Sequence, residues 1–167
     1  MHVFWPIVVA LLTGSSGDRP AVAPIVHVRA AANAASMLVD AAAQSAVVRD
    51  LITRLSATDV IVYVEVTASP QVALARTKLV TATPGARFLR IGLRTTLPPY
   101  DVTPLIAHEL QHAVEIAENA DVRDEDAVRR LFSSIGYQHG IDSYETDAAK
   151  YVERIVREEI RRRAPNP

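Results

Sequence analysis

The residues with the clearest chemical potential are His108, Glu109 and His112, which form a His-Glu-x-x-His motif. In an α-helix, two histidines at this spacing are offset by roughly 40° around the axis and about 6 Å along it. Both imidazoles therefore project from one side of the helix, where they can bind a single metal ion. Glu109 projects about 100° away from His108, beside the histidine pair. The pattern predicts that Glu109 acts as a general base on a metal-bound water and does not ligate the metal.

Apolar residues on both sides of the motif predict that it lies in a buried helix; they are Leu105, Ile106, Ala107, Ala113, Val114, Ile116 and Ala117. A buried histidine pair with a carboxylate lowers stability unless its polar atoms are satisfied, and a metal ion would satisfy them. The alternative is a pair of core histidines satisfied by hydrogen bonds alone. A chance occurrence of the motif in such a chain has odds of about 1%, which favours the metal site.

A catalytic zinc site needs three protein ligands and a water, so a third ligand must come from elsewhere in the chain. A ligand on a short loop after the motif would need a chain-turning glycine three residues beyond His112. That position holds Glu115, and the helical pattern continues. The best downstream candidate is Glu145, expected in the first turn of the last helix and on its apolar side. Small neighbours, Ala148 and Ala149, would allow the two helices to approach closely.

Each nearby carboxylate also has a second interpretation. Glu145 alternatively complements the dipole at the start of its helix, and Asp147 shares that position as a weaker ligand candidate. Glu115 lies on the same helix face as His108, one turn beyond His112. We expect Glu115 to be a buried polar partner that orients a ligand histidine, with direct ligation as the alternative.

The composition limits the other chemistry that this chain can perform. Its 167 residues, 49% hydrophobic and 22% charged, predict one ordinary globular domain. A net charge of −1 provides no global field for nucleic acid or an anionic membrane, so we expect neither as a partner. The absence of cysteine excludes disulfides, thiolate nucleophiles and cysteine zinc sites, so a metal must be held by histidine and carboxylate.

The helices and strands expected around these residues form a single α+β domain over residues 30–163. An alanine-rich helical pattern covers about residues 30–55, and the sequence also allows a break near Gln44 and Ser45. Strands are expected at residues 60–67, 78–83 and 87–94, the last two as a hairpin. Together they predict a small, mostly antiparallel sheet with an edge strand.

Helices are expected to dominate the rest of the chain. Thr103 should be the N-cap of the metal-binding helix, with Pro104 in the first turn and the end near Asn119. A short helix over residues 125–134 should end at Gly136. The remaining elements are a loop over residues 137–141 and a last helix over residues 144–162, capped by Asp142 or Ser143.

Residues 1–29 are interpreted as an apolar N-terminal segment with a linker, and residues 164–167 as a tail. The apolar run Val3–Leu12 is too short to span a bilayer but is typical of the core of a secretory signal. The Ala21–Ala23 triplet resembles a cleavage site, although Pro24 would follow the cut and no Lys or Arg precedes the apolar run. We expect an exported protein, periplasmic or secreted, with a cytoplasmic protein as the alternative.

His108, Glu109 and His112, followed by Glu145, resemble the gluzincin group of zinc metallopeptidases, in particular its minimal single-domain members. The order of elements is also similar, over roughly residues 45–160. The resemblance implies a zincin-like fold and one Zn²⁺ ion held by His108, His112 and Glu145. It implies hydrolysis of a peptide or protein substrate, in which Glu109 takes a proton from water and passes it to the leaving amine.

One position departs from the thermolysin-like pattern, in which an aspartate follows the ligand glutamate by four residues. Here that residue is Ala149, so support for a ligand histidine must come from elsewhere, with Asp147 as the candidate. The resemblance also implies a Tyr or His donor for the oxyanion; Tyr137 and His139 are the candidates, with loop packing as the alternative. The strand over residues 87–94 is expected to offer a free edge to an extended peptide.

Two other functions fit the same residues. One is a metal hydrolase of non-peptide amides or esters. The other is a zinc-binding interaction domain without turnover. Glu109 argues against the second, because a purely structural metal site does not need a general base.

Overall fold

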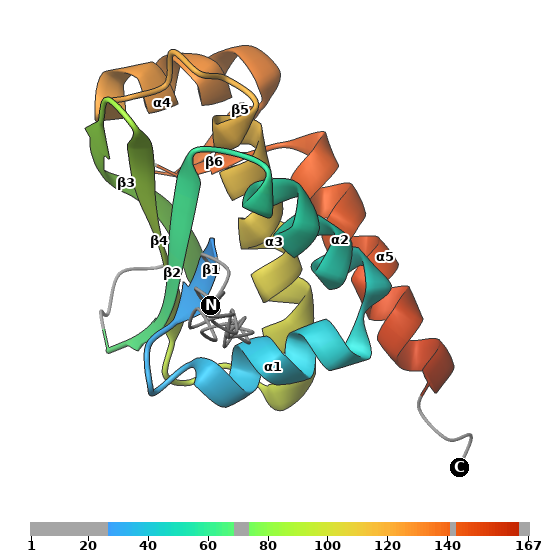
Figure 1. Cartoon of the computed structure of the whole chain (residues 1–167). Coiled ribbons are helices and arrows are strands. Elements are labelled where there is room, and N and C mark those ends of the chain that lie inside the picture. Colours follow the sequence, from blue (N-terminus) through green and yellow to red (C-terminus); the bar gives the residue numbers. More distant parts are fainter. Residues whose placement is uncertain (1–26, 69–73, 141–142, 164–167) are drawn as a thin grey trace, which may run out of the picture.

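The computed structural model describes residues 27–68, 74–140 and 143–163 (Figure 1). The signal-like run, the cleavage-like triplet and the tail of residues 164–167 lie outside these residues. The described chain is α+β, as predicted. In chain order its elements are β1 (Val28–Ala30), α1 (Ala35–Gln44), α2 (Ala46–Ser56), β2 (Val60–Thr67), β3 (Ala75–Thr83), β4 (Ala86–Arg94), α3 (Pro99–Ala117), α4 (Glu125–Ile135), β5 (Tyr137–Gly140), β6 (Ser143–Glu145) and α5 (Asp147–Arg163).

The larger sheet is mixed, so the prediction of a mostly antiparallel sheet is wrong. Its strand order is β1-β2-β4-β3, in which β1–β2 and β2–β4 are parallel and only the β3–β4 hairpin is antiparallel. Leu89, Ile91 and Leu93 of β4 are fully buried, whereas β3 is exposed along much of its length. This difference explains why β4 is central and β3 forms the edge. The prediction that residues 87–94 offer a free edge is therefore wrong.

Strand β1 lies at the end of the segment that was interpreted as a linker. Residues Val28–Ala30 pair in register with Val62–Val64 of β2. The ring of His27 adds a contact from Nδ1 to the carbonyl of Val60 at 3.0 Å. The folded domain therefore includes residues before position 30.

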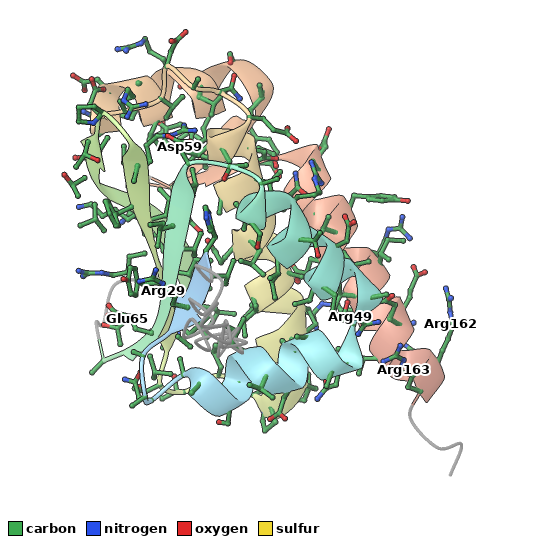
Figure 2. All side chains as sticks on the ribbon, in the orientation of Figure 1. Arg29, Arg49, Asp59, Glu65, Arg162 and Arg163 are labelled. Carbon is green, nitrogen blue, oxygen red and sulfur yellow. The ribbon has the colours of Figure 1, made fainter. Side chains whose placement is uncertain are left out.

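Helices α1, α2, α3 and α5 lie on one side of this sheet, with α3 nearest to it (Figure 1). The core between the two layers includes the fully buried side chains of Val62, Val64, Leu89, Ile91, Ile106 and Leu110. Burial of each large aliphatic side chain contributes about 1.5–3 kcal/mol relative to exposure. The other side of the sheet is polar in part, and Figure 2 shows Arg29 and Glu65 there. Packing against the sheet is thus what places α3.

The N-terminal helical region is broken at Ser45, the option that the sequence allowed. Ser45 has an extended backbone, and its hydroxyl oxygen accepts a hydrogen bond from the backbone N–H of Val48 at 3.2 Å. The same hydroxyl donates to Glu159 Oε2 at 2.5 Å. The break therefore both caps α2 and connects it to α5.

Helix α3 begins at Pro99, one turn earlier than predicted, and Pro104 lies inside it. Thr103 is not the N-cap; its hydroxyl donates to Gln44 Oε1 at 3.2 Å. A proline at position 104 removes only the bond to the carbonyl of Tyr100, an exposed residue in the first turn. The helix therefore continues through the proline.

The C-terminal region differs most from the prediction. The segment expected to be a loop forms β5, which pairs antiparallel with β6, and α5 begins only at Asp147. Thr146 caps this helix, because its hydroxyl oxygen accepts from the backbone N–H of Ala149 at 3.1 Å. Ser143 lies in β6 and is thus not the cap, and Asp142 lies outside the described residues. Of the two small residues expected where the last helix meets α3, Ala148 is exposed and Ala149 is buried.

Among the described residues, no helix has both the length and the hydropathy needed to cross a membrane.

Candidate metal centre

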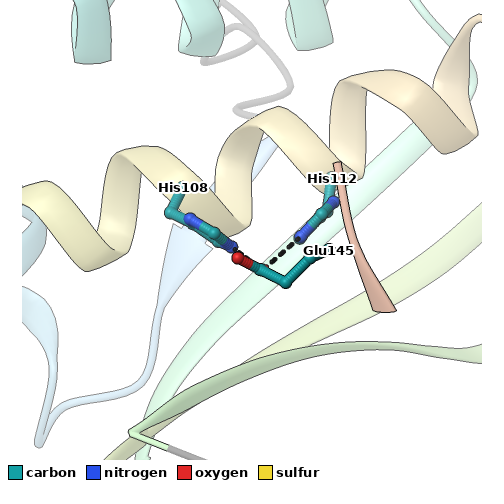
Figure 3. A group of neighbouring side chains, drawn as sticks. All are labelled: His108, His112 and Glu145. Carbon is teal, nitrogen blue, oxygen red and sulfur yellow. Dashed lines mark ion pairs between the residues drawn. The ribbon is translucent and has the colours of Figure 1, made fainter. Parts of the chain in front are cut away.

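Helix α3 presents His108 and His112 from one face, as the motif predicts. Each residue is only 6% exposed. The two rings meet edge to face, with their centroids 4.8 Å apart. Figure 3 shows that both point toward the same place, where the Glu145 carboxylate lies.

Glu145 reaches this place from strand β6, not from the first turn of the last helix. Its Oε1 lies 2.9 Å from His108 Nε2 and 3.9 Å from His112 Nε2. The three donor atoms all lie within 4.8 Å of one another. The predicted residue is therefore brought to the histidine pair, although by a different element. Its side chain is 22% exposed, so the group opens to solvent on the Glu145 side.

Each histidine has a carboxylate on its other ring nitrogen. His108 Nδ1 lies 3.1 Å from Glu153 Oε2, and His112 Nδ1 lies 2.8 Å from Glu115 Oε2. Glu115 is buried, as expected, and its other oxygen accepts from the Thr146 hydroxyl at 2.7 Å. Each carboxylate can accept a hydrogen bond from Nδ1–H, which keeps the imidazole proton on Nδ1. The Nε2 atom of each ring is then left unprotonated and can bind a metal.

The sequence prediction missed Glu153 and proposed Asp147 in its place. Asp147 is exposed, while Glu153 lies on the face of α5 that packs against α3. Arg157 holds Glu153 in turn, donating from Nη2 to Oε1 at 2.7 Å. The i, i+4 spacing of Glu153 and Arg157 was the available sequence signal, but many surface pairs on helices share it.

Two observations indicate that these three donor atoms fit a metal ion. His112 Nε2 is buried and has no hydrogen-bond partner among the described residues. A buried polar atom without a partner is costly, and an ion at the shared point would satisfy it. The ligand atoms of a tetrahedral zinc ion lie about 3.3 Å apart, and the two distances from Glu145 Oε1 to the histidine nitrogens, 2.9 and 3.9 Å, lie on either side of that value.

Glu109 is buried beside the ligand group and is not part of it. The Thr77 hydroxyl of β3 lies 2.6 Å from Glu109 Oε2 and 3.0 Å from the backbone carbonyl oxygen of the same residue. The carboxylate is therefore held near the ligands by a strand of the sheet. Among the described residues its other oxygen, Oε1, has no hydrogen-bond partner, so it is available for chemistry.

Of the two candidate donors to the oxyanion, Tyr137 and His139, the structure describes the side chain of Tyr137 only. Tyr137 is the β5 partner of Glu145 in the hairpin register, so the two side chains share a face. It is 45% exposed, and Lys150 Nζ donates to its phenol oxygen at 3.1 Å. The backbone of His139 lies in β5, while its side chain lies outside the described part of the chain.

The histidines and Glu145 are strongly coupled electrostatically. Burial opposes charge on His108, but hydrogen bonds to Glu145 and Glu153 outweigh it and raise the pKa to about 10. Burial also opposes charge on His112, but Glu115 and Glu145 raise its pKa to about 9. Burial opposes charge on Glu145 as well, yet the two histidine rings beside its carboxylate lower the pKa to about 2. The surroundings thus favour positive charge at the shared point.

Zinc binding to the metal-free protein at pH 7 should release about two protons. Both histidines have a pKa raised above 7, so each carries a proton that a metal ligand must lose. Zinc affinity should therefore increase as the pH rises from 7 toward 9 and decrease at lower pH. Calorimetric titration in buffers of different ionisation enthalpy counts the protons. Binding without proton release would contradict ligation by these two histidines.

The chain shows no significant similarity to known protein families, to curated proteins or to solved structures.

Proposed function

We propose that this protein is a zinc-dependent metallopeptidase of the gluzincin type with a zincin-like fold. The observation that carries the proposal is the convergence of His108, His112 and Glu145, with Glu109 held beside them by a separate contact. A structural metal site explains the first three residues but gives no role to a buried Glu109. A hydrolytic site requires such a residue.

The roles of the residues follow from their positions. His108, His112 and Glu145 would hold the zinc ion, which lowers the pKa of water and polarises a carbonyl when bound. Glu115 and Glu153 keep the proton of each imidazole on Nδ1. Glu109 accepts a proton from the attacking water at Oε1 and delivers it to the leaving amine.

Strand β3 is the element best placed to receive the substrate. It is the antiparallel edge of the sheet, and its Thr77 contacts the proposed general base. An extended peptide can add to such an edge through backbone hydrogen bonds, which are independent of side-chain sequence. Tyr137, on the same face of its hairpin as Glu145, is the proposed donor to the oxyanion, and His139 is the second candidate.

The direct test is metal analysis and hydrolysis with the purified wild-type protein. We expect one zinc ion per chain and cleavage of a mixed peptide library, with products identified by mass spectrometry. Stoichiometric zinc with no cleavage of peptides would favour the interaction domain. Cleavage of amide or ester substrates without peptide cleavage would favour the non-peptide hydrolase.

Glu145→Ala should remove zinc together with activity. Loss of a residue that hydrogen-bonds to a metal ligand reduces metal affinity about 10- to 100-fold, and loss of a ligand itself should reduce the affinity further. Zinc content after dialysis against a competing chelator measures the effect. Glu158→Ala is the matched control, because Glu158 lies on α5 and pairs only with Arg154 and Arg162 among the ion pairs described. Full zinc content in Glu145→Ala would refute the ligand assignment.

A further inference from the structure

Thr77 makes an unusual double contact with one residue of the metal-binding helix. Its hydroxyl lies within hydrogen-bond distance of both the side-chain Oε2 and the backbone oxygen of Glu109, at 2.6 and 3.0 Å. Both atoms are acceptors and the hydroxyl has one proton, so it donates to one of them or is shared between them. The shorter contact is the one to the carboxylate, as expected for a charge-assisted bond.

This contact fixes the position of a long, buried side chain. Glutamate has several rotatable bonds, and ordering such a side chain on burial has an entropy cost that a specific contact must offset. Thr77 lies on β3, where it pairs with Ile91 of the central strand β4. The hydroxyl is therefore held by the sheet, and through it the sheet determines where the Glu109 carboxylate lies.

We propose that Thr77 is a positioning residue, whose hydroxyl orients the carboxylate of Glu109 so that Oε1 faces the reacting water. The inference rests on the proposed function. Strand β3 would then serve both partners of the reaction, because the edge strand that receives the peptide also orients the general base. Placing base and substrate on one rigid element limits their relative movement, and a misplacement of about 1 Å can reduce a rate about 100-fold.

Thr77→Val tests the contact because it removes the hydroxyl and keeps the β-branched shape. In the zinc-loaded enzyme we expect kcat to fall about 10- to 100-fold with little change in KM, as for an interaction that matters mainly in the transition state. Thr77→Ser should restore most of the activity, since it restores the donor. Thr81→Val is the matched control on the same strand, because Thr81 lines the groove on the other side of the sheet with Tyr63 and Phe88.

A second readout needs no activity and no metal. Urea unfolding of the metal-free protein is compared for wild type, Thr77→Val, Glu109→Ala and the double variant. Thr77→Val should raise the unfolding equilibrium constant about tenfold when Glu109 is present, because the bond is to a charged group, and distinctly less when it is absent. The difference between the two effects measures the coupling.

The outcomes separate this inference from the proposed function. Coupling together with reduced kcat supports the role of Thr77. Unfolding effects that simply add, or wild-type kcat in Thr77→Val, overturn it while leaving peptidase activity of the wild type intact. A wild-type protein that binds zinc but cleaves nothing overturns the proposed function, and with it a role for Thr77 in turnover, whatever the unfolding data show.

Discussion

Glu109→Gln should keep stoichiometric zinc and lose activity by a factor of about 10² to 10⁴ in kcat/KM. Zinc is retained because Glu109 is not among the ligand atoms. The amide oxygen of glutamine can still accept the hydrogen bond from Thr77, so the local geometry is kept. What the amide cannot do is take a proton from water. The variant therefore separates metal binding from proton transfer.

The measurement pairs metal analysis with peptide hydrolysis under the same conditions. Glu118→Gln is the matched control, since Glu118 follows the same helix and its only described ion pair is the exposed one with Arg54. We expect wild-type activity from this control. Wild-type hydrolysis by Glu109→Gln with zinc bound would exclude the general-base mechanism. Loss of zinc from Glu109→Gln would instead mean that Glu109 contributes to holding the metal.

The parts of the site that follow from local periodicity were predictable. The spacing of His108, Glu109 and His112 determines their relative directions in any α-helix, whatever surrounds it. The burial of Glu115 follows in the same way, because it shares a face with the two histidines. For these residues, predicting the helix was sufficient to predict the arrangement.

The parts that depend on distant contacts were not predictable from the pattern. Glu145, the predicted third ligand, does lie beside the histidine pair, but the sequence pattern assigned it to a helix. It lies in a three-residue strand, whose pairing with β5 forms a short hairpin against α4. Isolated hairpins of this size have little stability of their own, so their sequences carry a weak signal. The role of Glu153 likewise depends on how α5 packs against α3.

The sheet illustrates the same limit. The sequences of β2 and β4 predicted two strands correctly, but no feature within either strand indicates that they pair in parallel. Their adjacency arises because the hairpin inserts its more apolar strand, β4, into the centre of the sheet. This choice also makes β3 the edge strand and brings Thr77 to Glu109. The contact between Thr77 and Glu109 therefore depends on nonlocal strand pairing, which the His-Glu-x-x-His motif does not predict.

Arg87→Met should destabilise the protein by about 3–5 kcal/mol, because it removes a buried donor that several acceptors share, and each buried acceptor left without a partner costs about 1–3 kcal/mol. The Arg87 residue is 1% exposed. Its Nη2 donates to Asp59 Oδ1 at 2.6 Å, and the guanidinium also donates to the carbonyl oxygens of Ile116, Ala117, Asn119 and Val122. Ile116 and Ala117 belong to the last turn of α3, whose carbonyls have no partner within the helix. The variant removes the Arg87 donor from all these acceptors, and only the oxygens of Ile116 and Asn119 keep a backbone N–H partner among the hydrogen bonds described.

We expect Arg87→Lys to be destabilised as well, because an ammonium group has only three donors and lacks the planar fork of a guanidinium. Urea unfolding of the metal-free protein measures the loss for Arg87→Met and Arg87→Lys. Arg90→Met, on the outer side of the same strand with a 54% exposed side chain, should change stability by no more than about 0.5 kcal/mol. Because Arg87 holds the end of α3 that follows His112, zinc affinity should fall as well. A stable Arg87→Met protein with unchanged zinc affinity would show that packing of α3 against the sheet is enough to place the ligands.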